Sequence, residues 1–89
     1  MEQFAIEWKN SAKKELKKLP KSAIIKVLAA VEILASEPRP PNSKKLVGAD
    51  RIFRLKIGEY RVIYQTVQHT LIIEIIRVRH RKDVYRRFP

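Results

Sequence analysis

The sequence lacks cysteine altogether, and this absence removes two classes of small protein. A chain of 89 residues without cysteine has no disulfides and no thiolate metal ligands. Neither a secreted disulfide scaffold nor a cysteine-based zinc domain fits. Long apolar runs are missing too: none approaches the roughly 20 residues of a membrane-spanning helix, and the first residues contain no signal-peptide hydrophobic stretch. We therefore expect a cytoplasmic protein with no membrane partner.

Acidic residues are the second scarcity. Only 9 Asp and Glu stand against 20 Lys and Arg, which gives a formal net charge of +11. An excess this large favours a polyanionic partner: nucleic acid, an acidic protein or an anionic membrane surface. A basic surface that serves solubility alone is the simpler alternative, and net charge does not decide between them. The hydrophobic content of 45% predicts a folded protein, and the length predicts one domain over residues 1–89.

The first part of the chain has the pattern of a strand followed by two helices. Apolar residues alternate over residues 4–8, as in a short strand. Asn10 or Ser11 is placed to cap a first helix. A second helix should end near Ser36, because Pro38 disfavours helix in the residue before it. Its expected core-facing stripe consists of Ile24, Leu28, Val31 and Ala35, widened by Ile25, Val27 and Leu34.

The second half is predicted to be a sheet. Residues 37–51 contain prolines and a glycine and are expected to be irregular. Gly58-Glu59 has the glycine-first pattern of a type II′ hairpin turn. The fold class is therefore α+β in the order β-α-α-β-β-β: an N-terminal helical hairpin packed on a small, mainly antiparallel sheet, with a short C-terminal helical tail from Lys82. The three strands, rich in β-branched and aromatic residues, are expected at 52–57, 60–67 and 70–79.

The hairpin turn determines which side chains share a face of the sheet. It places Lys56 directly opposite Arg61, on a face that also carries Arg54 and Gln65, with Ile63 among them. Like charges in opposite positions destabilise a sheet by about 0.2–1 kcal/mol, which suggests that an anion binds between them. The alternative is that both side chains extend into solvent. The other face, which can pack on the helices, holds Phe53, Leu55, Ile57, Tyr60, Val62 and Tyr64.

A second basic cluster lies near the end of the chain. Arginine forks match phosphate oxygens, and aromatic rings stack on unpaired bases. The alternatives are a solvated tail, or a tail whose Phe88 fills the core. If Gln68-His69 is a two-residue loop, Arg61 pairs with Ile76, and this register places His80 and not Arg81 on the basic face. A bulge or another loop length reverses this. The cluster consists of Arg77, Arg79, His80, Arg81, Lys82, Arg86 and Arg87, with Tyr85 and Phe88 among them.

These motifs together strongly resemble the RelE/ParE superfamily of toxins from toxin–antitoxin systems, over essentially the whole chain. One matching stretch runs from Lys44-Lys45-Leu46 through Gly48 to the hairpin Phe53-Arg54-Leu55-Lys56-Ile57-Gly58-Glu59-Tyr60-Arg61-Val62-Ile63-Tyr64. The ending Val78-Arg79-His80-Arg81-Lys82-Asp83-Val84-Tyr85 is similar to the RelE branch. The resemblance implies a toxin that enters the ribosomal A site and cuts mRNA, leaving a 2′,3′-cyclic phosphate and a 5′-hydroxyl.

The resemblance also implies roles for individual residues. Arg54 and Lys56 match the two basic positions in the second strand of the family fold. Arg61 matches the arginine after the hairpin tyrosine. Arg81 and Tyr85 match the arginine and tyrosine of the family's C-terminal segment. RelE carries lysine at the position of Arg54, and arginine does not give up its proton near neutral pH. The wider set expected to bind RNA or phosphate consists of Arg54, Arg77, Arg79, His80, Lys82, Lys44 and Lys45.

Attack of a ribose 2′-hydroxyl on the adjacent phosphate needs a base, stabilisation of charge and an acid. Two histidines and no carboxylate pair on the basic face argue against an ordinary histidine ribonuclease, and no metal or other cofactor is expected. Tyr85 is the candidate base because neighbouring cations favour the phenolate, and Lys56 is able to share that role. Arg61 and Arg81 would hold the phosphate, with Arg81 by family analogy assisting the leaving group. His80 is the rival acid or base.

Two other functions remain open from sequence alone. ParE-type toxins poison DNA gyrase through protein contacts, and a non-catalytic nucleic-acid-binding module would show only salt-dependent binding. Both toxin hypotheses imply a cognate RelB-like antitoxin with an acidic wrapping segment. The expected partners are therefore this antitoxin, the ribosome and mRNA, with operator DNA bound only by the toxin–antitoxin complex.

Overall fold

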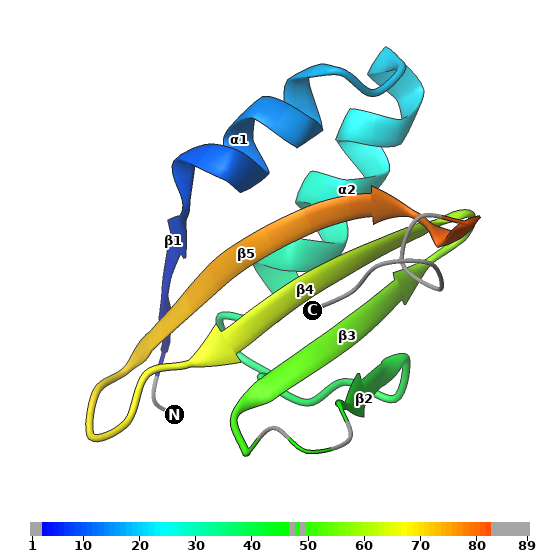
Figure 1. Cartoon of the computed structure of the whole chain (residues 1–89). Helices are drawn as coiled ribbons and strands as arrows, with labels where there is room; N and C mark the ends of the chain where they lie inside the picture. Colours follow the sequence, from blue (N-terminus) through cyan, green and yellow to red (C-terminus); the bar gives the residue numbers. More distant parts are fainter. Residues whose placement is uncertain (1–2, 47, 49, 83–89) are drawn as a thin grey trace.

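Two helices pack against one face of a five-stranded mixed sheet in the computed structural model, which describes residues 3–46, 48 and 50–82 (Figure 1). The strand order is β1-β5-β4-β3-β2, with β1 parallel to β5 and the remaining pairs antiparallel. The predicted α+β class is confirmed, while the predicted C-terminal helical tail lies largely outside the described residues. The elements are β1 (Ala5–Trp8), α1 (Asn10–Lys17), α2 (Lys21–Ile33), β2 (Ser43–Lys45), β3 (Ile52–Ile57), β4 (Tyr60–Thr66) and β5 (Ile72–His80).

Strand β2 is an element that the sequence pattern did not predict. It has three residues and follows a proline-rich stretch, so it has no periodic pattern of its own. Its position depends on β3: the Lys56 N–H donates to the Asn42 carbonyl, and the Asn42 side-chain amide donates to the Lys56 carbonyl, both at 2.9 Å. The Ser43 hydroxyl also donates to Pro40 O at 2.7 Å. The order is therefore β-α-α-β-β-β-β, with an additional edge strand beside the basic residues of β3.

Helix α1 begins without the side-chain cap expected of Asn10 or Ser11. Its N-cap residue is Lys9, with no capping hydrogen bond from a side chain. The Ser11 hydroxyl instead donates to Ile76 O at 3.2 Å. This correction has a tertiary cause, because β1 ends at Trp8 and α1 then lies along the edge of β5 that β1 leaves uncovered.

The apolar stripe of α2 differs from the predicted one. Val27, Val31 and Leu34 are buried as expected, but Leu28 is 41% exposed and Ile25 is 62% exposed. The buried row begins instead at Ala23 and continues at intervals of four residues. A helix that is apolar on most of its surface allows several stripes, and here the row of smaller side chains packs on the sheet.

The hydrophobic core lies between α2 and the helix-facing side of the sheet. Phe53, Leu55, Val62 and Tyr64 all belong to it, as the hairpin register predicts. The Tyr64 ring stacks on Phe53 with centroids 5.4 Å apart. Its hydroxyl donates to Pro38 O at 2.7 Å, and burial raises the pKa of Tyr64. This bond ties the loop that precedes β2 to the core.

Candidate nucleic-acid interface

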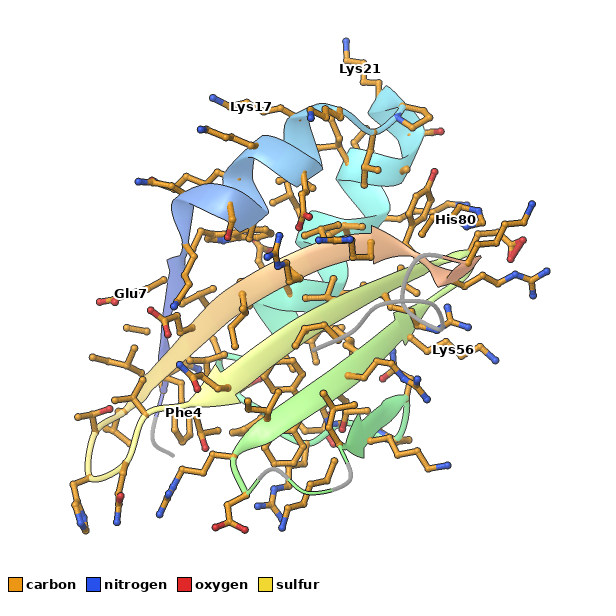
Figure 2. The ribbon with its side chains drawn as sticks, viewed as in Figure 1. Phe4, Glu7, Lys17, Lys21, Lys56 and His80 are labelled. Carbon is orange, nitrogen blue, oxygen red and sulfur yellow. The ribbon has the colours of Figure 1, made fainter. Side chains whose placement is uncertain are left out.

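Four cationic side chains from three strands meet around one hollow on the side of the sheet away from the core. We call this hollow of about 380 Å³ the basic groove; it is lined by Pro41, Asn42, Ser43, Lys44, Arg54, Lys56 and Arg61. Figure 2 shows Lys56 near the turn between β3 and β4, with its side chain directed outward. The groove therefore joins residues that are up to 20 positions apart along the chain.

The pairing of the strands explains why these cations are neighbours. Lys56 is opposite Arg61 and Arg54 is opposite Ile63, as predicted, while Lys44 of β2 is opposite Arg54. The turn adopts the expected conformation, since Gly58 has φ +57. Opposite residues in an antiparallel pair have Cα atoms about 4.5–5.5 Å apart. The register therefore concentrates positive charge around the groove.

Arg61 is the buried member of this set. Its side chain does not extend into solvent, because the residue is only 5% exposed. One terminal nitrogen, Nη1, donates to Gly58 O at 2.8 Å and to Tyr60 O at 2.9 Å. Both acceptors are neutral, and within the described part of the chain neither Arg61 nor Lys56 has a carboxylate partner. The guanidinium is thus held in place with its charge uncompensated, whereas Lys56 is exposed.

A β-bulge determines which C-terminal residues share the face of Arg61. Between Ile63 and Tyr64 the register against β5 shifts, so that Arg61 is opposite Arg79 and Tyr64 is opposite Ile75. The two-residue loop considered above is therefore wrong, and the bulged alternative is correct. Odd-numbered residues after the bulge lie on the basic face, whereas His80 lies across from Tyr60, with ring centroids 5.6 Å apart.

Arg81 lies beside the β3–β4 turn. Its backbone N–H donates to Glu59 O at 2.8 Å, and its Nε is 3.4 Å from a Glu59 carboxylate oxygen. Both side chains are about half exposed, so an approaching phosphate is able to compete for this arginine. Lys82, next along the chain, is exposed, and its N–H donates to the His80 Nδ1 at 3.3 Å.

Arg77 and Arg79 interact with α1 instead of lining the groove. Glu15 accepts the Val78 N–H at 2.8 Å and lies 3.3 Å from the Arg77 Nη1 and 2.6 Å from the Arg79 Nε. Glu15 and Ser11, one helical turn apart, together bind backbone groups at the edge of β5. This contact fixes the strand just before Arg81.

The remaining candidates lie apart from the groove or outside the described residues. Lys45 is exposed on β2 and pairs with Phe53, so it is on the opposite face from Lys44. Tyr85, the candidate base, lies outside the described residues, as do Arg86, Arg87 and Phe88. Sequence reasoning missed Asn42, which lines the groove and bonds to Lys56. A lone asparagine after prolines indicates only a turn, so no sequence signal identified it.

Two classes of feature are absent from the residues that the structure describes. No group of three or more histidine, aspartate or glutamate side chains is placed to hold a metal ion there. Neither helix in that part of the chain is long and apolar enough to cross a membrane.

The family model and the similar proteins that match this chain are all toxins. Residues 6–85 match the family model of the ParE toxin of the type II toxin–antitoxin system parDE. The chain is 33% identical over 86 residues to a Methanocaldococcus jannaschii protein named toxin RelE1, covering 93% of this chain and 96% of that one. It is 31% identical over 88 residues to toxin RelG of Mycobacterium tuberculosis, covering 94% and 98%.

A solved structure extends this agreement to the fold. The archaeal RelE–RelB complex of Pyrococcus horikoshii contains a chain that superposes with a TM-score of 0.79 at 28% identity, covering 89% of this chain and 96% of that one.

Proposed function

Since this chain belongs to the RelE/ParE toxins of type II toxin–antitoxin systems and is of the RelE type, we propose that it inhibits translation by cutting mRNA on the ribosome. The reaction would be attack of a ribose 2′-hydroxyl on the adjacent phosphodiester. The site of action would be the cytoplasm, where ribosomes and mRNA are its partners.

The observation that carries this proposal is the buried guanidinium of Arg61 beside Lys56, neither of which has a carboxylate partner in the described part of the chain. Both line the basic groove, a space of about 380 Å³. Arg61 is held by the turn carbonyls and is aligned before any substrate arrives. Preorganised cations stabilise the negative charge that develops on a phosphate during such an attack, without reorganising at the moment of reaction.

The geometry divides the proposed roles. Arg61 would hold the phosphate, and Arg81 would stabilise the leaving oxygen after exchanging Glu59 for the substrate. Lys56 is exposed and would share the proton transfer with Tyr85, whereas Arg54 would serve only as a cation. Tyr85 stays the proposed base by family resemblance. His80 is disfavoured because it lies across from Tyr60 on the other face.

We expect this site to be weak on free RNA. The groove is open and its cations recognise phosphate rather than base sequence. The ribosome would supply the alignment of the strand, which is where much of the rate enhancement of a bimolecular reaction originates.

The proposed regulator is a RelB-like antitoxin. RelE–RelB complexes are known for the similar proteins of Pyrococcus horikoshii and Mycobacterium tuberculosis. A net charge of +11 suits an acidic wrapping segment. We propose that this segment covers Lys56 and Arg61 or displaces the tail that carries Tyr85, and that operator DNA is bound only by the complex.

Gyrase inhibition is the second candidate, because the matching family model describes a ParE toxin. The deciding experiment is induction of the wild type, Lys56→Ala, Arg81→Ala and the control Lys13→Ala, followed by primer-extension mapping of mRNA ends. We expect new ends at codon positions for the wild type and Lys13→Ala only, with no effect of purified protein on gyrase supercoiling. Inhibited supercoiling with intact mRNA would replace the proposal with the gyrase function, and harmless expression would favour a binding module.

A further inference from the structure

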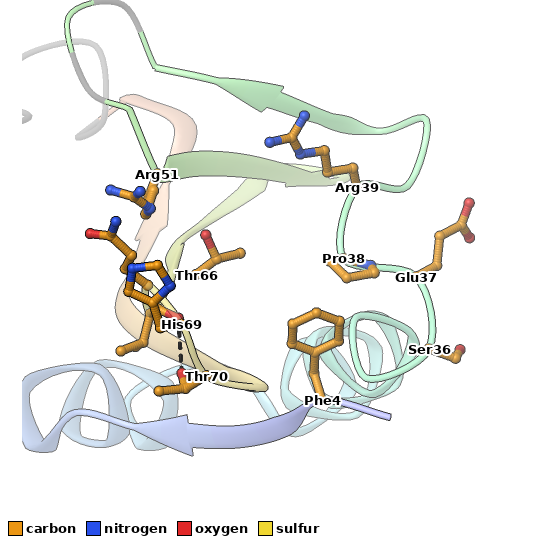
Figure 3. Close-up of a pocket in the computed structure, with 11 residues that line it drawn as sticks. Phe4, Ser36, Glu37, Pro38, Arg39, Arg51, Thr66, His69 and Thr70 are labelled. Atoms are coloured by element: carbon orange, nitrogen blue, oxygen red, sulfur yellow. Dashed lines mark hydrogen bonds between the residues drawn. The ribbon is translucent and has the colours of Figure 1, made fainter. Parts of the chain in front are cut away.

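A second hollow lies at the other end of the sheet from the β3–β4 turn. We call it the end hollow; its volume is about 700 Å³, and its lining includes Phe4, Pro38, Arg39, Arg51, His69 and Thr70 (Figure 3). Arg51 precedes β3 by one residue, so along the strand it is about 16 Å from Lys56. The two hollows are thus separate: residues 37–39 line the end hollow, and residues 41–42 line the basic groove.

The end hollow combines an apolar wall with cations. Figure 3 shows Phe4 and Pro38 on one side of the opening and His69 with Arg51 on the other. Glu37 is the one carboxylate in its lining, and it points away from the space between these groups. An aromatic ring and arginine together suit an unpaired nucleotide, because rings stack on bases and arginine forks bind phosphate.

Arg51 is the cation best placed to accept a ligand. Its side chain is exposed and makes no hydrogen bond or ion pair within the part of the chain that the structure describes. Arg39, in contrast, lies over the Phe53 ring at 4.9 Å from its centroid. Arg51 therefore has its full donor capacity available at the mouth of the hollow.

The backbone at His69 is a second, independent observation. Its φ of +63 makes it the one non-glycine residue with positive φ among those described. This conformation is uncommon for residues other than glycine and is concentrated at functional positions. Here it turns the tip of the β4–β5 hairpin so that His69 faces the opening across from Phe4.

We propose that the end hollow binds one unpaired nucleotide of RNA, with the base against Phe4 and Pro38 and the phosphate at Arg51. The inference rests on the proposed action on RNA and adds a second contact, remote from the site of cleavage. A volume of about 700 Å³ is in the range of small-molecule sites. A helical segment of a protein partner needs a row of apolar anchors, whereas the apolar lining here is limited to Phe4, Pro38 and Val67.

The test is an NMR titration of the full-length protein with uridine 5′-monophosphate, and separately with inorganic phosphate. We expect the nucleotide to shift the amide signals of Phe4, Val67 and Thr70, and phosphate to leave Phe4 and Val67 unchanged. Arg51→Ala should raise the Kd about ten-fold or more, as loss of a charge-assisted hydrogen bond does. Lys17→Ala, at the far end of the molecule from Phe4 (Figure 2), should change the Kd by less than about two-fold.

Binding of single-stranded RNA gives a second readout. The slope of log K against log salt should fall by about 0.7 in Arg51→Ala, which is the contribution of one phosphate contact on a single strand. The proposal is overturned if the nucleotide shifts only basic-groove residues such as Ser43 and Arg54, or if phosphate reproduces all its shifts. It is also overturned if an acidic antitoxin peptide shifts Phe4, Val67 and Thr70 while the nucleotide does not.

The outcomes separate this inference from the proposed cleavage. Lys56 does not line the end hollow, so the Lys56→Ala variant should bind the nucleotide there as the wild type does. If Lys56→Ala loses mRNA cleavage and the wild type does not bind the nucleotide in the end hollow, only the inference fails. If binding is observed and Lys56→Ala still cleaves normally, only the role of the basic groove in cleavage fails.

Discussion

Glu15 is predicted to stabilise the protein far more than an ordinary surface carboxylate, because it replaces a missing neighbour strand. Its Oε1 accepts the Val78 N–H at 2.8 Å, and its Oε2 pairs with Arg77 and Arg79. A hydrogen bond to a charged group contributes about 1.5–3 kcal/mol. Each partly exposed ion pair adds up to about 1 kcal/mol. Glu15→Ala should therefore lower the free energy of unfolding by about 2–4 kcal/mol.

The size of the effect in related variants identifies its origin. Glu15→Gln keeps an acceptor for Val78 and loses only the charge, so we expect a loss of about 1 kcal/mol. Glu32→Ala is the control, since Glu32 is an exposed helical carboxylate with no hydrogen bond or ion pair in the described residues. Urea unfolding gives the free energies, and Glu15→Ala should also lower the Tm by at least about 10 °C in a protein of this size. A loss for Glu15→Ala within about 0.5 kcal/mol of the control would refute the reasoning.

Three further predictions concern the core, the hairpin turn and alkaline stability. Leu34→Ala should cost about 2–5 kcal/mol in urea unfolding and Leu28→Ala less than about 1 kcal/mol, because Leu34 is fully buried and Leu28 is 41% exposed; similar losses would contradict the assigned stripe. Gly58→Ala should cost about 1–2 kcal/mol through its positive φ alone, since an added Cβ meets no atom within 4 Å, and a neutral result in the same assay would argue against the type II′ turn. Burial raises the pKa of Tyr64, so above about pH 10 the unfolded state loses this proton first and stability falls as pH rises. Tyr64→Phe should remove that decline from unfolding measured between about pH 9 and 11, and a parallel decline in both proteins would exclude Tyr64 as its source.

The central hairpin could be predicted from sequence because a local signal determined it. Gly58 specifies the turn, the turn specifies the register, and the register places Lys56 opposite Arg61. This register alone indicates a basic face, and the structure adds Lys44 from β2 to it. Within this hairpin, the burial of Arg61 and its bonds to the turn carbonyls were not predictable from sequence.

Features that depend on tertiary contacts were not predictable in the same way. The bulge at Ile76 is compatible with several loop lengths, so sequence left the side of Arg81 open. The Ser11 hydroxyl bonds to β5 and does not cap α1, and this depends on where β1 ends. The role of Asn42 depends on β2, whose three residues are too few to show a period.

The most direct test of the account is single-turnover cleavage of mRNA on programmed ribosomes by wild type, Arg61→Lys and Lys13→Ala. Lysine keeps the charge of Arg61 but replaces the planar fork with a single nitrogen, whereas Arg61 binds both turn carbonyls through Nη1 alone and has further nitrogens for a phosphate. We expect a rate at least about 100-fold lower for Arg61→Lys, with Lys13→Ala unchanged and free RNA left uncut by all three. A full rate for Arg61→Lys, or rapid digestion of free RNA, would contradict it.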